Sequence, residues 1–322
     1  MSLLLREPTE AFAPYRSALI ALGEARPDVV VLGADLGTST EIDGFQTRFP
    51  DRFFNFGAAE QNEVAAAAGM AFEGLVPFVH SFGVFLTRRA YEQVCVQVAM
   101  HRANVKLVGV IPGLTSRLGP THQAIEDLAL MRTLPGMTVI DPADATEIEQ
   151  AVPAIAAHMG PVYLRMLRRE VPRLLDPAVY RFEIGRAVTI RDGSDVAILS
   201  CGVMLGPAVE AAGLLSDAGI SAAVVHVPTI RPLDRDAVAG WASRTRAVVT
   251  AENHLVAGGL GAAVAEVVSE TRPVPMRRVG LRDTFAVPGS PGYLFERYGL
   301  NAEAIRGAAS EALGARLDGA PA

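Results

Sequence analysis

The chain has 322 residues, half of them apolar, and a formal net charge of -6. This length exceeds what one hydrophobic core usually supports, so we expect two domains. The acidic charge and the lack of a Lys/Arg cluster on any candidate helix argue against a nucleic-acid or anionic-membrane partner, because both bind basic surfaces.

Export and metal binding find no support in the sequence. The apolar run near the amino terminus is too short for a signal peptide, and later apolar stretches are broken by Gly, Pro and Glu. Cys95 and Cys201 lie in different halves, without a CxxC pair or a histidine at ligand spacing. We therefore expect a cytoplasmic metabolic protein with reduced, structural cysteines.

Short β-branched runs alternate with Ala-rich stretches through the first half of the chain. The expected strands begin at Val29, Val76, Val105, Thr138 and Val162, and the expected helices cover 60–73, 91–100, 125–134 and 145–157. Strands that alternate with helices predict a mainly parallel sheet covered on both faces.

A second alternating series follows a proline-containing stretch of little periodicity, 168–182, which we interpret as the domain boundary. Its expected strands begin at Val196, Ala222 and Ala247, its helices cover 206–215, 234–241 and 260–269, and two closing helices lie near Leu294 and Ala302. The predicted fold class is therefore α/β, with two domains, 1–178 and 179–322, each a mainly parallel sheet flanked by helices.

Four loops that follow predicted strands are the places to look for chemistry: 33–40, 55–62, 80–85 and 112–123. In open α/β sheets, ligands bind at the carboxyl ends of the strands. A crevice shared by these loops is the predicted site.

Each candidate residue in these loops also has a structural interpretation. Glu60 opens a helix, where a carboxylate is stabilised by the helix dipole and free N–H groups. Phe82 and Phe85, three apart after a strand, could simply pack in the core. His122 follows a loop rich in Gly and Pro, a setting that favours a role in a site about as much as a structural one.

Polar residues in the 33–40 loop and in the loop after the expected strand at Thr138 have turn or cap interpretations. Asp35 and Ser39 fit turn or N-cap positions. Asp141 and Asp144 fit a loop that leads into a helix N-cap, and no third ligand stands near them, so no metal site is expected.

The order of these segments resembles a known family. GAAEQNEVAAAAGMA, HSFGVF and GPTHQAIEDLALMRTLPGMTVIDPAD together resemble the pyrimidine-binding domain of transketolases and deoxyxylulose phosphate synthases. TAENHLVAGGLGAAVAE and LRDTFAVPGSPGYLFERYGL are similar to the carboxyl-terminal domain of the same families. The resemblance covers nearly the whole chain and implies dependence on thiamine diphosphate.

The resemblance implies roles for the residues that match the cofactor pocket. The family glutamate at Glu60 hydrogen-bonds N1′ of the aminopyrimidine and switches the cofactor on. The aromatics at Phe82 and Phe85 form the pocket for the pyrimidine ring, and Arg88 stands on the same flank where the family has an aromatic or polar residue. Asp35 matches an aspartate of the cofactor-facing loop.

It also implies substrate-binding roles. His122 matches a histidine that hydrogen-bonds the donor. Ser39 and Arg168 match positions that bind the phosphate end of the sugar, where a guanidinium fork suits an oxyanion. Arg165 is a second candidate, because synthases of this superfamily place an arginine there.

The chain departs from the family pattern at two substrate positions. Leu118 replaces an aspartate that contacts a donor hydroxyl, and the phosphate-binding histidine of the family falls near Val110 or Ile111. A non-phosphorylated, sulfonated or carrier-bound substrate therefore has to be considered.

A third departure concerns the partner. Full-length transketolases hold Mg²⁺ through a GDG segment and a downstream Asn, and this pair does not precede the first motif of this chain. The resemblance implies that a separate diphosphate-binding subunit supplies the Mg²⁺ site, in an α2β2 heterotetramer, and that this chain is inactive alone.

Three functions remain open at this point. The leading one is the carboxyl-terminal-half subunit of a split transketolase, a transferase that moves a two-carbon ketol unit from a ketose donor to an aldehyde acceptor. The β subunit of a 2-oxo acid dehydrogenase, or a synthase-like thiamine diphosphate enzyme, is the main alternative, although GPTHQ favours the transketolase branch. A non-catalytic scaffold is the third, against which the joint retention of Glu60, Phe82, Phe85 and His122 argues.

Overall fold

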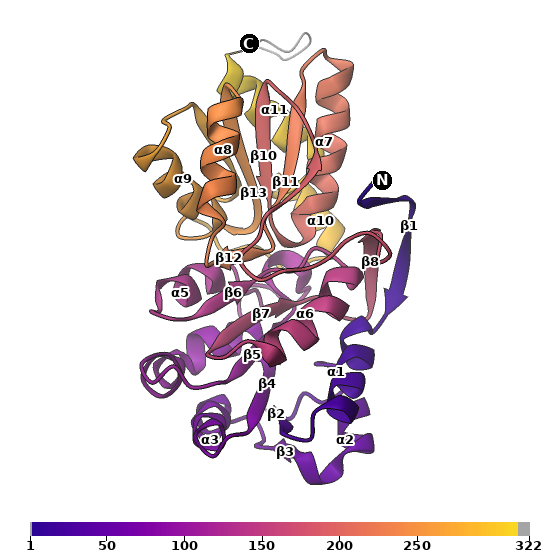
Figure 1. Ribbon diagram of the computed structural model, residues 1–322, viewed down its shortest axis with the longest axis vertical. Coiled ribbons are helices and arrows are strands. Elements are labelled where there is room, and N and C mark those ends of the chain that lie inside the picture. The colour runs from indigo at the N-terminus through magenta and orange to yellow at the C-terminus, as the bar shows by residue number, and fades with distance from the viewer. Residues whose placement is uncertain (1, 315–322) are drawn as a thin grey trace.

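The computed structural model describes residues 2–314 and shows two α/β domains stacked along the long axis of the molecule (Figure 1). The strands are β1 (Leu4–Phe12), β2 (Val29–Gly33), β3 (Phe53–Asn55), β4 (Val76–Phe82), β5 (Lys106–Val110), β6 (Thr138–Ile140), β7 (Val162–Met166), β8 (Glu170–Leu175), β9 (Val188–Arg191), β10 (Val196–Ser200), β11 (Ala222–His226), β12 (Thr229–Arg231), β13 (Ala247–Leu255) and β14 (Met276–Leu281). The α-helices are α1 (Pro14–Ala25), α2 (Asp43–Arg48), α3 (Glu60–Phe72), α4 (Tyr91–Gln93), α5 (Asp127–Thr133), α6 (Ala145–Ala157), α7 (Leu205–Asp217), α8 (Arg235–Arg244), α9 (Leu260–Glu270), α10 (Pro291–Arg297) and α11 (Ala302–Leu313). Shorter helical turns are η1 (Pro50–Arg52), η2 (Phe85–Arg89), η3 (Val94–Ala99), η4 (Gly113–Thr115) and η5 (Gly202–Met204). This is the two-domain α/β fold class that the sequence predicted.

The amino-terminal domain is built on a seven-stranded sheet in the order β12-β6-β7-β5-β4-β2-β3. All its neighbouring pairs are parallel except β12 with β6. Every residue of β2, β4, β5 and β7 is buried, because helices cover both faces of the sheet (Figure 1). The carboxyl ends of these four strands therefore meet at one edge.

The carboxyl-terminal domain has a five-stranded sheet in the order β14-β13-β10-β11-β9. Only β9 runs antiparallel to its neighbour. Helices α7 and α11 pack together beside this sheet, and α8 and α9 pack together as a second pair (Figure 1).

The proline-containing segment 168–182, interpreted from the sequence as the domain boundary, contains the strand β8. β8 pairs antiparallel with β1 in a separate two-stranded sheet. Pro172 is tolerated because each strand of a two-stranded sheet has a free edge. Its partner lies about 160 residues away in the sequence, so local periodicity did not reveal the pairing.

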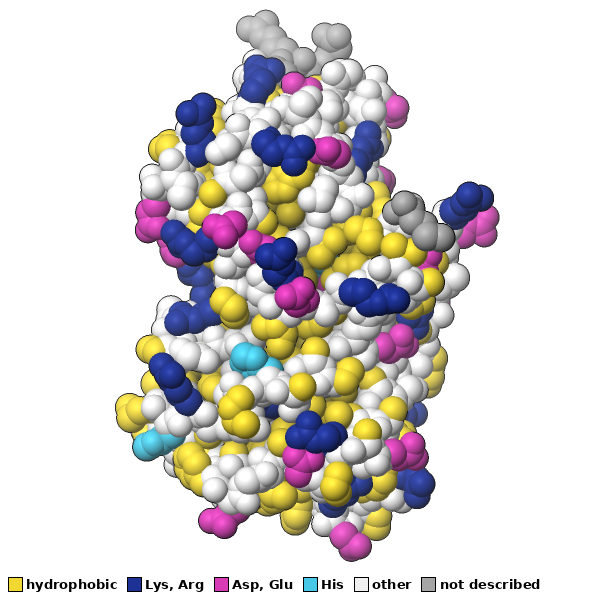
Figure 2. All heavy atoms as spheres, viewed as in Figure 1, with side chains coloured by type: hydrophobic (Ala, Val, Ile, Leu, Met, Phe, Trp, Pro, Cys, Tyr) yellow, Lys and Arg dark blue, Asp and Glu magenta, His cyan; other side chains and the backbone are white. Residues whose placement is uncertain are grey.

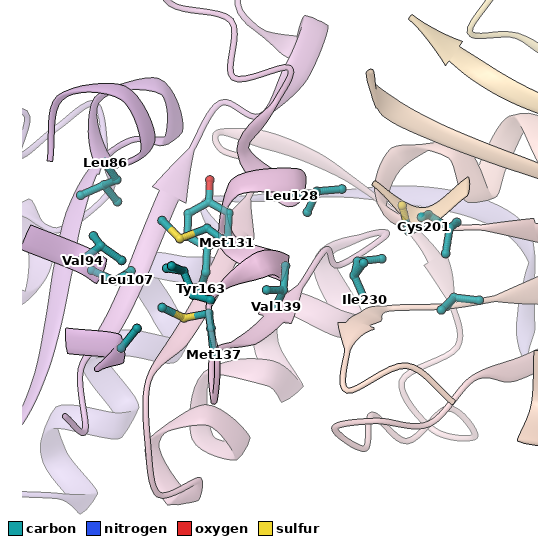
Figure 3. Packing of buried hydrophobic residues seen from close by; sticks show 14 of the residues in the cluster. Leu86, Val94, Leu107, Leu128, Met131, Met137, Val139, Tyr163, Cys201 and Ile230 are labelled. Carbon is teal, nitrogen blue, oxygen red and sulfur yellow. The ribbon is translucent and has the colours of Figure 1, made fainter. Parts of the chain in front are cut away.

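The two domains share structure across the predicted boundary. β12, from the second half of the chain, adds to the edge of the first sheet (Figure 1). A continuous apolar cluster runs from Val139 of β6 and Leu128 of α5 to Ile230 of β12 and on to Cys201 (Figure 3). The limits 1–178 and 179–322 stay a prediction.

The two cysteines, Cys95 and Cys201, are free thiols. Burial, reinforced by the Asp141 carboxylate, raises the pKa of Cys201 far above its ordinary value, so this thiol is unreactive. No helix among residues 2–314 has the length and apolar character needed to cross a membrane. On the face seen in Figure 2, basic and acidic side chains are interspersed over the surface.

Candidate active site

Glu60 lies at the first turn of α3, and its side chain is buried although it is charged and close to the sheet edge. Its two oxygens have different partners. Ser81 at the end of β4 donates its hydroxyl to Oε1 over 3.1 Å, and Arg89 donates from Nη1 to Oε2 over 2.7 Å. An ordinary helix-start carboxylate points to solvent, so burial at the strand ends favours the functional interpretation of Glu60.

An aromatic cluster lies beside this carboxylate. The rings of Phe82 and Phe85 stack with their centroids 5.8 Å apart. His122 meets both edge-on, 6.1 Å from Phe82 and 5.3 Å from Phe85. The structure thus brings together three residues that the sequence separates by up to 40 positions, and His122 Nδ1 in turn lies 2.8 Å from the hydroxyl of Thr121.

Two adjacent arginines, Arg88 and Arg89, make different contacts, although the sequence pointed only to Arg88. Arg88, expected at the cofactor, forms an ion pair with Glu126 and donates to the carbonyls of Pro120 and Gln123. It therefore braces the loop that carries His122. Arg89, which sequence reasoning missed, is the arginine whose guanidinium lies over the Phe85 ring, 4.6 Å from its centroid.

The helical register explains why Arg89, and not Arg88, lies over the Phe85 ring. The segment η2, Phe85–Arg89, is a π-helical turn in which the N–H of Ala90 bonds to the carbonyl of Phe85. The expectation that Arg88 lies beside Phe85 assumed an α-helical turn, in which residues three apart are neighbours. The wider turn brings the fourth residue, Arg89, over the ring, and π-turns of this kind are frequent at functional sites.

The loop carrying His122 is held from the carboxyl-terminal domain. Asn253 of β13 accepts from the N–H of Leu114 over 2.9 Å and donates to the carbonyl of Pro112 over 3.2 Å. Gly113 has a positive φ of 53°, and a Cβ there would lie 2.3 Å from Asn253 Oδ1. The second domain therefore positions a residue of the first domain's site.

Arg168 connects the aromatic cluster to a neighbouring hollow. Its guanidinium carbon lies 5.8 Å from the centroid of Phe82, and Nη1 donates to the backbone carbonyl of Ser39 over 3.1 Å. Arg168 and Leu118 both line a hollow of about 560 Å³. Of the residues expected to bind substrate, Leu118 and Arg168 line the same hollow, whereas Ser39 meets Arg168 through its backbone carbonyl.

Asp35 is exposed in a separate, smaller hollow of about 180 Å³. Its backbone N–H donates to Oδ1 of Asn55 over 3.0 Å, and its φ is 60°. The Asn55 amide, at the end of β3, fixes the turn after β2, and Asp35 remains accessible at this edge of the sheet.

Arg165 lies away from the hollow, buried at the domain interface. It donates to Asp127 from Nε and Nη2, each over 2.8 Å, and to Asp141 over 3.2 Å. Burial favours a higher pKa for Asp127, but the guanidinium overrides it and lowers that pKa, whereas burial dominates at Asp141 and raises its pKa. Nη2 also donates to the carbonyls of Ala124 and Asn253, so the structure places Arg165 in an interdomain network.

A second carboxylate lies one helical turn beyond Glu60 and was missed. Glu63 is fully buried; Oε1 accepts from the N–H of His80, and Oε2 has no partner within the described residues. Burial, together with the neighbouring Glu60 charge, raises the pKa of Glu63 to about 8. The spacing EQNE at a helix start was the available signal.

The acidic loop at the end of β6 has a structural role. Asp144 caps α6 by accepting from the N–H of Glu147 over 2.9 Å and also accepts from the N–H of Leu175. Within residues 2–314 there is no group of three or more His, Cys, Asp or Glu side chains arranged to hold a metal ion.

Comparisons with known proteins show the family to which the chain belongs. The family model of the transketolase pyrimidine binding domain matches residues 11–173, and that of the transketolase C-terminal domain matches residues 185–305. A putative uncharacterized transketolase family protein of Sinorhizobium fredii is 49% identical over 302 residues, covering 93% of this chain and 87% of the relative. A 6-deoxy-6-sulfo-D-fructose transketolase subunit of a Clostridium species is 45% identical over 298 residues, covering 92% of each. The solved structure of a split-gene transketolase, described as an inactive β4 tetramer, superposes with a TM-score of 0.88 at 44% identity and covers 95% of this chain and 100% of that one. The chain therefore belongs to the transketolase family.

Proposed function

We propose that the chain is the β subunit of a split transketolase, which transfers a two-carbon ketol unit from a ketose donor to an aldehyde acceptor with thiamine diphosphate. One observation carries the proposal. A planar cationic group, the Arg89 guanidinium, lies over the Phe85 ring and donates to the buried Glu60 carboxylate. A flat heterocycle such as an aminopyrimidine needs an aromatic face on which to stack and a carboxylate to which it can hydrogen-bond. Phe85 and Glu60 provide these two groups, so the residues present fit the cofactor.

The residues of this chain would hold the pyrimidine end of the cofactor. Phe82 and Phe85 supply the stacking surface, and Glu60 supplies the carboxylate for N1′. When bound, thiamine diphosphate supplies the carbanion chemistry that amino-acid side chains lack. Glu60 would hold or release the proton shared with N1′ of the bound cofactor, and the Ser81 hydroxyl, which donates to Oε1, keeps this carboxylate oriented.

Substrate contacts are assigned to the open side of the aromatic cluster. His122, edge-on to both phenylalanines, is placed to hydrogen-bond a donor hydroxyl or carbonyl next to the reacting carbon. Arg168, which contacts Phe82 and lines the larger hollow, is assigned to the end of the substrate farthest from the reacting carbon.

A separate diphosphate-binding subunit is proposed to complete the site and hold Mg²⁺, in a heterotetramer of two subunits of each kind. The inactive β4 tetramer of the split-gene relative supports this proposal, because a β-type chain assembled only with itself lacks activity there. The sulfofructose transketolase subunit at 45% identity makes a sulfonated ketose one donor to test.

The test is to co-express the chain with a candidate diphosphate-binding subunit, add thiamine diphosphate and Mg²⁺, and follow ketol transfer from a panel of ketoses. Glu60→Gln should abolish transfer while the complex stays assembled. Glu73→Gln, an exposed glutamate at the other end of the same helix, is the matched control and should remain active. An active Glu60→Gln complex would refute the mechanism. Release of carbon dioxide from 2-oxo acids, with no transfer from any ketose, would move the chain to the 2-oxo acid branch.

A further inference from the structure

Glu60 and Glu63 are two buried carboxyl groups in the first turn of α3, beside the carboxyl end of β4. Consecutive residues of β4 hold them. Ser81 donates its hydroxyl to Glu60 Oε1 over 3.1 Å, and the N–H of His80 donates to Glu63 Oε1 over 3.2 Å. The two groups therefore share one buried environment, in which the charge of Glu60 acts on Glu63.

The two carboxyl groups differ in their countercharge. Oε2 of Glu60 accepts from the guanidinium of Arg89 over 2.7 Å, whereas Oε2 of Glu63 is buried and has no hydrogen-bond partner among residues 2–314. Burial, with a further contribution from the Glu60 charge, raises the pKa of Glu63 to about 8. Glu63 therefore holds a proton at neutral pH, next to a carboxylate that is paired with a cation.

The elements packed on α3 leave Glu63 without a cation of its own. These elements are β2, β4, η2, η3 and α4. Among them, η2 alone carries Lys or Arg, and its two arginines, Arg88 and Arg89, are paired with Glu126 and Glu60. The remaining titratable side chains of these elements are those of His80, Tyr91, Glu92 and Cys95.

His80, the closest of these side chains in the hydrogen-bond pattern, is uncharged. Burial lowers its pKa to about 4. Its Nδ1 lies 3.0 Å from the carbonyl oxygen of Leu32, and its Nε2 lies 2.6 Å from the hydroxyl of Tyr15, whose own pKa burial raises well above the ordinary value. A neutral His80 therefore donates to Leu32 and accepts from Tyr15, and it offers Glu63 its backbone N–H alone.

Glu63 gives the fold little in return for its burial. A carboxyl group that is buried with one hydrogen bond and no cation destabilises the folded chain when it ionises. Residues that lower the stability of their own chain are typical of functional sites, where activity retains them. Its place one helical turn from Glu60 indicates which activity.

We propose that Glu63 is a positioning residue that keeps one proton beside Glu60, so that the buried pair carries a single negative charge while Glu60 shares its proton with the cofactor. The proposal rests on the function proposed above and adds a residue to it. When the pyrimidine stacks on Phe85, Arg89 has to leave that ring, and Glu60 loses its countercharge. A second negative charge on Glu63 would then tighten the hold of Glu60 on the shared proton and keep the proton from N1′.

The kinetic test follows ketol transfer by the assembled complex as a function of pH, at saturating thiamine diphosphate. Wild-type turnover should fall about tenfold from pH 7 to pH 9, as does the protonated fraction of a group with a pKa of about 8. Glu63→Gln should not show this fall, because an amide cannot ionise. Glu73→Gln, an exposed glutamate at the other end of α3, is the matched control and should keep the wild-type profile.

A calorimetric test counts protons instead of turnovers. Thiamine diphosphate is titrated into the assembled complex in two buffers that differ in ionisation enthalpy. At pH 8.5 the wild-type complex should take up about half a proton more than Glu63→Gln, because Glu63 regains its proton when Arg89 moves away. At pH 6.5 the two complexes should agree, since Glu63 is already protonated. Equal uptake at pH 8.5 would contradict the proposal.

Infrared titration of the isolated chain keeps the inference separate from the proposed function. Difference spectra between wild type and Glu63→Gln should show the C=O stretch of a protonated carboxyl group at pH 7, and this band should disappear as the pH passes about 8. In a Glu60→Gln background the band should disappear at a lower pH, because the neighbouring charge is gone.

This infrared pattern, with no ketol transfer by the wild-type complex, would reject the function and keep the protonated Glu63 beside Glu60. Absence of the band at pH 7 would overturn the inference. So would a wild-type activity profile without the fall, or a fall that Glu63→Gln retains.

Discussion

Arg89 donates from Nη1 to Oε2 of Glu60 over 2.7 Å, and this ion pair joins a half-exposed cation to a buried carboxylate. The same guanidinium lies on the face of Phe85. The charged group on which the proposed chemistry depends is thus compensated within its own chain.

Arg89→Met should lower the free energy of unfolding by about 1–2 kcal/mol, because Glu60 is left buried without its cation. In a Glu60→Gln background, Arg89→Met should lower the free energy of unfolding much less. Urea denaturation of the four proteins at pH 8 gives the coupling energy directly. Arg48→Met, which removes an exposed pair with Glu24, is the control with little expected effect. Additive losses from the two substitutions would contradict a functional ion pair.

Arg89 also predicts a competition at the cofactor pocket. Its guanidinium lies on the ring face that we assign to the pyrimidine, so the side chain has to move before the cofactor stacks there. In the assembled complex, Arg89→Ala should lower the thiamine diphosphate concentration needed for half-maximal activity. A higher requirement would mean that Arg89 contacts the bound cofactor instead of vacating the ring.

Glu63 predicts a pH-dependent stability. Its pKa is about 8 in the folded chain and near 4.5 when unfolded, so the folded state binds the extra proton between these values. Stability therefore falls as pH rises from about 4.5 to about 8 and is flat above that. Glu63→Gln removes the free-energy cost of ionising a buried carboxyl group. It should therefore raise the free energy of unfolding by on the order of 2 kcal/mol at pH 8 and leave it unchanged at pH 4. Equal gains at both pH values, measured by urea denaturation, would contradict a buried, protonated Glu63.

Substitution of Arg88 tests whether this residue holds the His122 loop in place or contacts the cofactor. Arg88→Ala removes three anchors of the His122 loop, so KM for the ketose donor should rise several-fold while the thiamine diphosphate requirement stays unchanged. Steady-state kinetics with donor and cofactor varied in turn distinguish the two roles. A raised thiamine diphosphate requirement with an unchanged donor KM would instead support the cofactor-binding role of Arg88 expected from the sequence.

Arg165 is expected to act on stability. Arg165→Met leaves Asp127 and Asp141 buried without their cation and should lower the free energy of unfolding by about 3–5 kcal/mol. Arg165→Lys should also destabilise, since an ammonium cannot replace the paired bonds to Asp127. A stable Arg165→Met protein with a raised donor KM would instead support substrate binding.

Sequence reasoning succeeded where a signal was local. Hydrophobic runs and alternation located the buried parallel strands and the helices between them, because every residue of those strands is buried on both faces. It failed for β1, β8 and β12, which are short or pair only at an edge with partners far away in the chain.

The α/β class, the family and the loops that hold Glu60, Phe82, Phe85 and His122 could all be predicted from the sequence, because strand order sends these loops to one edge. The roles of the arginines could not. A π-turn directs Arg89 to Glu60 and Arg88 to the His122 loop, and packing between the domains buries Arg165. Side-chain direction depends on helical register and on contacts between distant segments, and neither is written in the local spacing of residues.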